Sequence, residues 1–185
     1  MTEITAAMVQ ELREATNVSM MECKRALVEA GGDKERAIRL LRERGVAIAA
    51  KKATRQANQG LIAAAVRGGQ VGALIEVNCE TDFVAKNPGF QAFVQSLADK
   101  AADDERPITE WAGPDVSAKV AEIGENIVAR RSTRYTLQGP GLIAAYIHLH
   151  GKVGVLAIHE VAFVESAELV PDFERRQQEA AGDHA

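Results

Sequence analysis

The segment that decides the fold reads Asn78-Cys79-Glu80-Thr81-Asp82-Phe83-Val84-Ala85-Lys86-Asn87. Residues 71–79, which lead into it, are rich in β-forming side chains and predict a strand. Asn87-Pro88 then places a capping side chain before a proline in a first helical turn. The helix that follows has an apolar stripe of Phe90, Phe93, Val94, Leu97 and Ala101. We therefore expect a strand, a short loop and a helix that covers one face of a sheet.

The strand before this segment belongs to a hairpin that occurs twice in the chain. Residues 61–66 and 71–79 are two β-rich runs joined by the turn sequence Arg67-Gly68-Gly69-Gln70. Its motifs recur later, Gly60-Leu61-Ile62-Ala63-Ala64 as Gly141-Leu142-Ile143-Ala144-Ala145 and Val71-Gly72-Ala73-Leu74 as Val153-Gly154-Val155-Leu156. We predict a core over residues 60–165 that is built from two related antiparallel hairpins.

The first 45 residues predict three short helices joined by tight turns. Their apolar faces are Val9, Leu12 and Ala15, then Met20, Cys23, Leu27 and Ala30, then Ala37, Leu40 and Leu41. Ser19 and Asp33 are the expected N-caps of the second and third helices, and Gly45 is the expected end of the third. The predicted fold class is α+β, with a three-helix bundle over residues 1–45 followed by the hairpin core.

Two further segments complete the predicted organisation. Residues 46–59 read as an alanine-rich helix or stiff connector that carries Lys51, Lys52 and Arg55. This basic group is either a solvated face or a docking surface for an acidic partner. Residues 116–123 predict another short helix, and the polar tail over residues 166–185 is expected to fray.

Composition limits the classes of partner. The chain has 185 residues, of which 46% are hydrophobic, and its 22 basic and 26 acidic side chains give a formal net charge of −4. This balance favours neither nucleic acid nor an anionic membrane as a partner. No apolar run approaches the roughly 20 residues of a membrane span and no signal peptide is recognised, so we expect a cytoplasmic protein. Cys23 and Cys79 are interpreted as small buried hydrophobic residues.

Enzyme signatures are missing from the sequence. It contains no phosphate-binding glycine loop, no nucleophile elbow and no His-Glu-x-x-His pair, so we expect neither an enzyme nor a cofactor. His148 and His150 would alternate onto one face of a strand, where they are either metal ligands or polar positions at a hairpin tip. Glu76, Glu80 and Asp82 are either an acid and base pair or a solvated strand end.

Phe83 has two interpretations that its neighbours leave open. It follows two acidic residues in a loop, after a strand has ended and before a helix begins. It is either a plug in the core or an exposed aromatic wedge for a groove on a partner, since aromatic side chains often anchor interfaces.

The segment Thr81-Asp82-Phe83-Val84 resembles the hallmark sequence of the bacterial elongation factor Ts family. The flanking Glu76-Val77-Asn78-Cys79-Glu80 and Ala85-Lys86-Asn87 are also similar to that family. Further similarity covers Leu12-Arg13-Glu14-Ala15-Thr16, Met20-Met21-Glu22-Cys23-Lys24-Arg25-Ala26-Leu27, Lys51-Lys52-Ala53, Ile123-Gly124-Glu125-Asn126-Ile127 and Arg130-Arg131. The resemblance spans nearly everything from residue 8 to about residue 160.

This resemblance implies a guanine-nucleotide exchange factor in translation elongation. The first bundle would be a ubiquitin-associated-like domain that docks on elongation factor Tu, with Leu12, Arg13, Met20 and Met21 as its docking residues. Thr81, Asp82, Phe83 and Val84 would bind the GDP form of that partner, disturb its magnesium and phosphate site and promote GDP release. The alternatives are a non-catalytic interaction module, an enzyme that uses the two histidines, and an RNA-associated role of the basic connector.

The chain departs from the family pattern at two places. Asn17-Val18-Ser19 stands where relatives have Gly-Ala-Gly, which reduces the freedom of a docking loop. Longer relatives continue past the second hairpin with a helix and further elements, whereas this chain ends soon after it. We therefore expect one face of the second hairpin to be uncovered, and to pack either on the first repeat or on a second copy in a homodimer.

Overall fold

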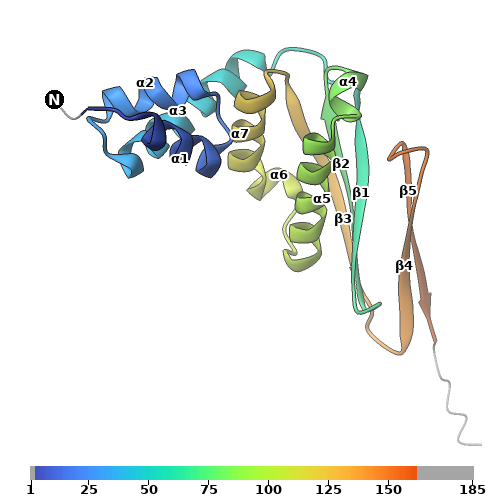
Figure 1. Cartoon of the computed structure of the whole chain (residues 1–185). Coiled ribbons are helices and arrows are strands. Elements are labelled where there is room, and N and C mark those ends of the chain that lie inside the picture. The colour runs from blue at the N-terminus through green and yellow to red at the C-terminus, as the bar shows by residue number, and fades with distance from the viewer. Residues whose placement is uncertain (1–2, 162–185) are drawn as a thin grey trace, which may run out of the picture.

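The computed structural model describes residues 3–161, so the tail over residues 166–185 lies outside the described residues. Its helices are α1 (Ala6–Thr16), α2 (Met20–Glu29), α3 (Lys34–Lys52), α4 (Asp82–Ala85), α5 (Pro88–Asp103), α6 (Ile108–Trp111) and α7 (Gly113–Ile123). Its strands are β1 (Gln59–Arg67), β2 (Val71–Cys79), β3 (Ile127–Thr136), β4 (Gly141–His148) and β5 (Val153–Glu160). Figure 1 shows a helical bundle, a layer of helices, a three-stranded sheet and a separate hairpin, which confirms the α+β class.

The N-terminal bundle forms around the predicted caps. The side chains of Ser19 and Asp33 accept hydrogen bonds from the backbone of their first helical turns, as expected. Asn17 ends α1 in the left-handed conformation, at φ 53°. The buried core consists of Val9, Leu12, Cys23, Ala26, Leu27, Ala30, Ala37 and Leu41. Met20, which was expected on the buried face, is 43% exposed instead, because it occupies the first position of α2 at the rim of the bundle.

The prediction that the third helix ends at Gly45 was wrong. Helix α3 continues through Gly45 to Lys52 and includes much of the expected connector. Gly45 is buried against α7, where an added Cβ would lie 3.5 Å from the carbonyl oxygen of Ser117. Gly45 therefore lies at a contact between two helices and not at a helix end, and this packing joins the bundle to the core.

The central sheet has the antiparallel order β1-β2-β3. Its first two strands and their turn, with Gly68 and Gly69 at positive φ, are the predicted first hairpin. Helix α5 covers one face of this sheet with the predicted stripe, of which Phe90, Val94, Leu97 and Ala101 are buried. Strand β3 was not predicted, because its sequence includes three arginines and lacks a clear apolar pattern. Ile127 is its one buried residue.

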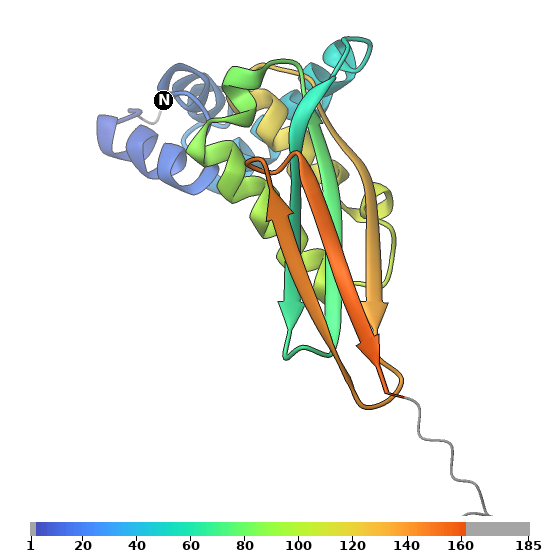
Figure 2. The ribbon, with the colours of Figure 1, turned by 90° about the vertical axis from the view of Figure 1, so that its right-hand side faces the viewer.

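The second hairpin packs on the face of the sheet opposite α5. Strands β4 and β5 pair antiparallel as predicted and form their own two-stranded sheet (Figure 2). Gly72 approaches Ile143, and Gly154 approaches Ile62 and Leu74, so that the two repeats face each other closely. One face of this hairpin therefore packs on the first repeat, while its other face carries exposed apolar side chains, Leu142, Tyr146, Val153 and Val155.

The expected alternation of His148 and His150 on one strand face was wrong. Strand β4 ends at His148, and Leu149 and His150 adopt left-handed backbone conformations in the turn. His148 instead stacks on Tyr146, with 5.7 Å between the ring centroids. Within residues 3–161 there is no group of three or more side chains placed to hold a metal ion, and no helix that could cross a membrane.

Candidate functional site

Phe83 projects from a short helical turn at one end of the sheet. Helix α4 begins three residues after the end of β2 (Figure 1). The Oγ1 atom of Thr81 accepts a hydrogen bond of 3.3 Å from the amide of Val84. Ala85 is buried and Val84 packs partly against the core, whereas Phe83 is 82% exposed. The structure therefore places Phe83 outside the core, so the interpretation as a core plug was wrong.

Asp82 adds a negative charge beside this aromatic ring. Its carboxylate accepts a hydrogen bond of 2.6 Å from Nζ of Lys86, one helical turn later. This hydrogen bond, together with the positive charge of Lys86, lowers the pKa of Asp82 below its ordinary value. The turn therefore presents a large apolar side chain and an ionised carboxylate from adjacent positions.

The base of the turn is held by the loop that precedes β3. Glu125 accepts hydrogen bonds from the amide nitrogen and the hydroxyl of Thr81, at 3.0 Å and 2.6 Å. Glu80 accepts one of 2.6 Å from the amide of Asn126. We did not single out Glu125 or Asn126 as site residues from the sequence, because their partners lie more than 40 residues away.

The other predicted carboxylate and basic groups have partners within the chain. Glu76 pairs with Arg131 at 2.7 Å and Asp82 pairs with Lys86 at 2.6 Å, so each of these carboxylates has a basic partner. Lys52 donates to the carbonyl of Gly124 at 2.6 Å, and Arg55 lies 3.6 Å from Glu80. Most of the basic connector thus holds the core together, an interpretation that sequence reasoning missed.

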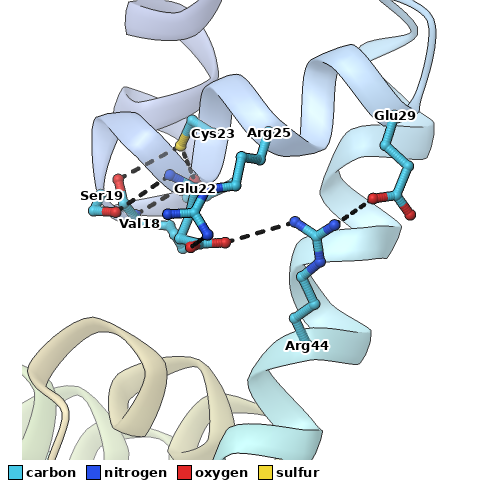
Figure 3. Close-up of polar contacts among 8 residues, drawn as sticks. Val18, Ser19, Glu22, Cys23, Arg25, Glu29 and Arg44 are labelled. Atoms are coloured by element: carbon cyan, nitrogen blue, oxygen red, sulfur yellow. Dashed lines mark hydrogen bonds and ion pairs between the residues drawn. The ribbon is translucent and has the colours of Figure 1, made fainter.

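A second exposed surface lies on the helical bundle. Figure 3 shows its polar contacts: Ser19 caps α2 at the amide of Glu22, and Arg44 of α3 pairs with both Glu22 and Glu29 of α2. The thiol of Cys23 lies 3.5 Å from the carbonyl of Val18 and tightens the loop before α2. These contacts fix the start of α2, where two methionines are exposed.

The expected docking residues of the bundle differ in accessibility. Met21 is 62% exposed, and Arg13 and Met20 are also at the surface. Leu12 is completely buried in the bundle core, so it can only support such a surface from behind. Asn17 adopts the left-handed conformation that a glycine would adopt at this loop, so the departure from the family pattern preserves the turn.

These features define the class of protein. An exposed aromatic turn that the chain's own polar groups hold in place, together with a bundle that exposes methionines, is typical of a protein that acts by binding another protein. Residues 80–170 match the family model described as Elongation factor TS. This match assigns residues 80–170 of the chain to the elongation factor Ts family.

Individual relatives agree with this assignment. The chain is 48% identical over 162 residues to Elongation factor Ts of Symbiobacterium thermophilum, a match that covers 84% of this chain and 53% of the relative. It is 45% identical over 169 residues to Elongation factor Ts of Nostoc sp., covering 84% and 54%, and 42% identical over 185 residues to that of Nautilia profundicola, covering 93% and 60%. The chain thus spans about half the length of the curated relatives it matches.

Proposed function

We propose that this chain is a guanine-nucleotide exchange factor that accelerates the release of GDP from elongation factor Tu. The observation that carries the proposal is the exposure of Phe83, a large aromatic side chain on an anchored turn beside an ionised Asp82. In this proposal Thr81 and Val84 anchor the turn, while Asp82 and Phe83 enter the partner and disturb its magnesium and phosphate site. The chain needs no cofactor and no nucleic acid for this activity, which takes place in the cytoplasm.

The physical basis of the exchange is negative coupling between two ligands of one protein. Contacts that form only with the nucleotide-free partner weaken nucleotide binding by the same free energy. Burying a Phe side chain contributes roughly 1.5–3 kcal/mol, and each 1.4 kcal/mol or so is a factor of ten. Phe83 alone would therefore weaken nucleotide binding by roughly ten- to a hundredfold. A larger effect requires further contacts.

The bundle supplies those contacts in the proposed complex. Arg13, Met20 and Met21 are exposed on the helical bundle, and Phe83 is exposed on the turn beside the central sheet. Methionines adapt their shape to a partner surface, and Arg can pair with carboxylates there. We propose that the bundle provides most of the affinity for the partner and that the turn at Phe83 provides the displacement of nucleotide.

The test is the release rate of a fluorescent GDP analogue from elongation factor Tu at increasing concentrations of this chain. We expect a saturable acceleration, and Phe83→Ala should lower the maximal rate by roughly ten- to a hundredfold. Leu149→Ala is the matched control, because Leu149 is an exposed apolar side chain in the turn between β4 and β5. Equal maximal rates for wild type and Phe83→Ala would contradict the proposed role of Phe83 in displacing nucleotide.

Two further readouts separate the alternatives. Because Phe83 is exposed, Phe83→Ala should change the free energy of unfolding by less than about 0.5 kcal/mol, so any loss of exchange is not a loss of folding. A stable complex between the wild-type chain and elongation factor Tu without faster release would indicate a non-catalytic interaction module instead.

A further inference from the structure

The carboxylate of Glu125 holds the residue that starts α4. One oxygen accepts a hydrogen bond of 3.0 Å from the amide nitrogen of Thr81, and the other accepts one of 2.6 Å from its hydroxyl. Both bonds end on one ionised group, and hydrogen bonds to charged groups are stronger than neutral ones. Glu125 therefore fixes the backbone and the side chain of Thr81 together.

The hydroxyl of Thr81 has two roles that depend on each other. It donates its single hydrogen to Glu125, and its oxygen accepts the amide hydrogen of Val84 at 3.3 Å. With the hydrogen directed at Glu125, a lone pair of the oxygen remains available for the amide of Val84. Glu125 thus orients the N-cap of the turn that carries Phe83.

The loop that carries Glu125 is itself attached to the end of α3. Nζ of Lys52 donates to the carbonyl of Gly124 at 2.6 Å, and the side-chain amide of Asn126 donates to the carbonyl of Arg55 at 2.7 Å. Asn126 is almost completely buried, and its backbone amide also donates to Glu80. The loop therefore connects the helix that belongs to the bundle with the turn that carries Phe83.

We propose that Glu125 is a positioning residue for nucleotide exchange, which acts through Thr81 to hold Asp82 and Phe83 ready for insertion into the partner. This inference rests on the proposed exchange function. A turn that is ordered before binding loses less conformational entropy on insertion, so more of the contact free energy remains to displace nucleotide. Docking through the bundle does not depend on this order.

The experiment compares Glu125→Ala and Glu125→Gln with the control Glu122→Gln. Glu122 is a carboxylate at the end of α7 that pairs with Lys119 at 2.7 Å and makes no contact with Thr81. The carboxamide of Glu125→Gln has one acceptor oxygen, so it can keep one of the two bonds to Thr81. Each variant is assayed for the maximal rate of GDP-analogue release and for the concentration that gives half of that rate.

We expect Glu125→Ala to lower the maximal rate about tenfold, equivalent to about 1.4 kcal/mol, with the half-saturating concentration changed less than about twofold. Glu125→Gln should lie between Glu125→Ala and wild type, and Glu122→Gln should match wild type. In the free chain, Glu125→Ala should accelerate amide hydrogen exchange at Thr81 and Val84 but not in β1 and β2.

A second pair of variants keeps the inference testable if Glu125→Ala does not fold. Thr81→Ser retains the hydroxyl and should keep a higher maximal rate than Thr81→Val, which loses the hydroxyl and should fall about as far as Glu125→Ala. Wild-type rates for either Glu125→Ala or Thr81→Val would overturn the positioning role alone. If the wild-type chain itself fails to accelerate release, the proposed function is wrong, which is a different result.

Discussion

Cys79 and Phe83 are four residues apart and have opposite surroundings. Cys79 is completely buried at the end of β2, and its thiol donates to the carbonyl of Thr81 at 3.2 Å. Phe83 is exposed one turn later. The chain thus leaves the core within a few residues, and the buried thiol anchors the base of the exposed turn.

The first prediction concerns the titration of Cys79. Burial, which disfavours the thiolate, and to a smaller extent the nearby charge of Glu125 raise the pKa of Cys79 from 9.0 to about 11. The folded chain therefore keeps this proton when the unfolded chain has lost it. The stability that results is fully present below pH 9.0 and is lost as pH rises toward about 11, at about 1.4 kcal/mol per pH unit.

Urea unfolding of the wild type and Cys79→Ala across this pH range measures the effect. The difference in free energy of unfolding between the two should decrease as pH rises, because only the wild type carries the thiol. A difference that stays constant from pH 9.0 to about 11 would contradict the raised pKa.

Among the helices, α3 shows how packing can reverse a local signal. Glycine often ends a helix, yet Gly45 lies within α3, where it packs against Ser117 and Ala121 of α7. A glycine inside a helix costs stability relative to alanine, and the packing of α7 against α3 offsets this cost. The close contact between α3 and α7 sets the position of the bundle relative to the sheet (Figure 1).

We predict that Gly45→Ala stabilises the protein by about 0.5–1 kcal/mol. An added Cβ would lie 3.5 Å from the Ser117 carbonyl oxygen and 3.7 Å from Cβ of Ala121, which are ordinary contact distances. Gly45→Leu should instead destabilise it by about 1–3 kcal/mol, because the longer side chain forces α3 and α7 apart. Thermal and urea unfolding would reveal both changes, and destabilisation by Gly45→Ala would show that the contact is tighter than described.

Between the two sheets, the repeated glycines set the distance. An added Cβ at Gly72 would lie 2.6 Å from Cγ2 of Ile143, and one at Gly154 would lie 2.5 Å from Cγ2 of Ile62. Both neighbours are stiff β-branched side chains, so they cannot move away easily. Gly72→Ala and Gly154→Ala should therefore each destabilise the protein by about 1–3 kcal/mol.

Gly139→Ala is the control for this pair, because nothing lies within 4 Å of its added Cβ. Its effect should stay within about 0.5 kcal/mol. Amide hydrogen exchange should also rise in β4 and β5 of Gly72→Ala and Gly154→Ala, before it rises in β1 and β2. Unchanged protection of β4 and β5 would mean that the sheets do not depend on these glycines.

At the scale of the whole molecule, the outer face of the second hairpin exposes several apolar side chains. Tyr146 of β4 lies opposite Val155 of β5, while Leu142 and Val153 lie on the same face towards opposite ends of the hairpin, and all four are exposed. A contiguous apolar surface of this kind favours association with another surface. We predict that two copies of the chain associate through this face.

Sedimentation equilibrium at several concentrations tests the prediction. The average mass should rise with concentration toward that of a dimer. Tyr146→Lys should reduce the association, because it places a charge in the centre of the apolar face. Arg130→Ala, a change at an exposed position of β3, is the control. A monomer mass that does not change with concentration would exclude this homodimer.

The sequence by itself determined the local elements of this protein. The caps at Ser19, Asp33 and Asn87, the turn at Gly68-Gly69 and the stripe from Phe90 to Ala101 all depend on residues within a few positions of one another. The repeated motifs likewise predicted both hairpins. Such signals can be read from the chain because their physical causes are local.

Only the tertiary structure decided the rest. Strand β3 pairs through its backbone with β2, so its arginine-rich side chains gave no strand pattern. Gly45 continues a helix because α7 packs on it, and Glu125 holds Thr81 across 44 residues of chain. The exposure of Phe83 follows from the same cause, since burial depends on which distant segments meet. Contacts between segments far apart in sequence leave no local pattern, and in this protein those contacts build the candidate site.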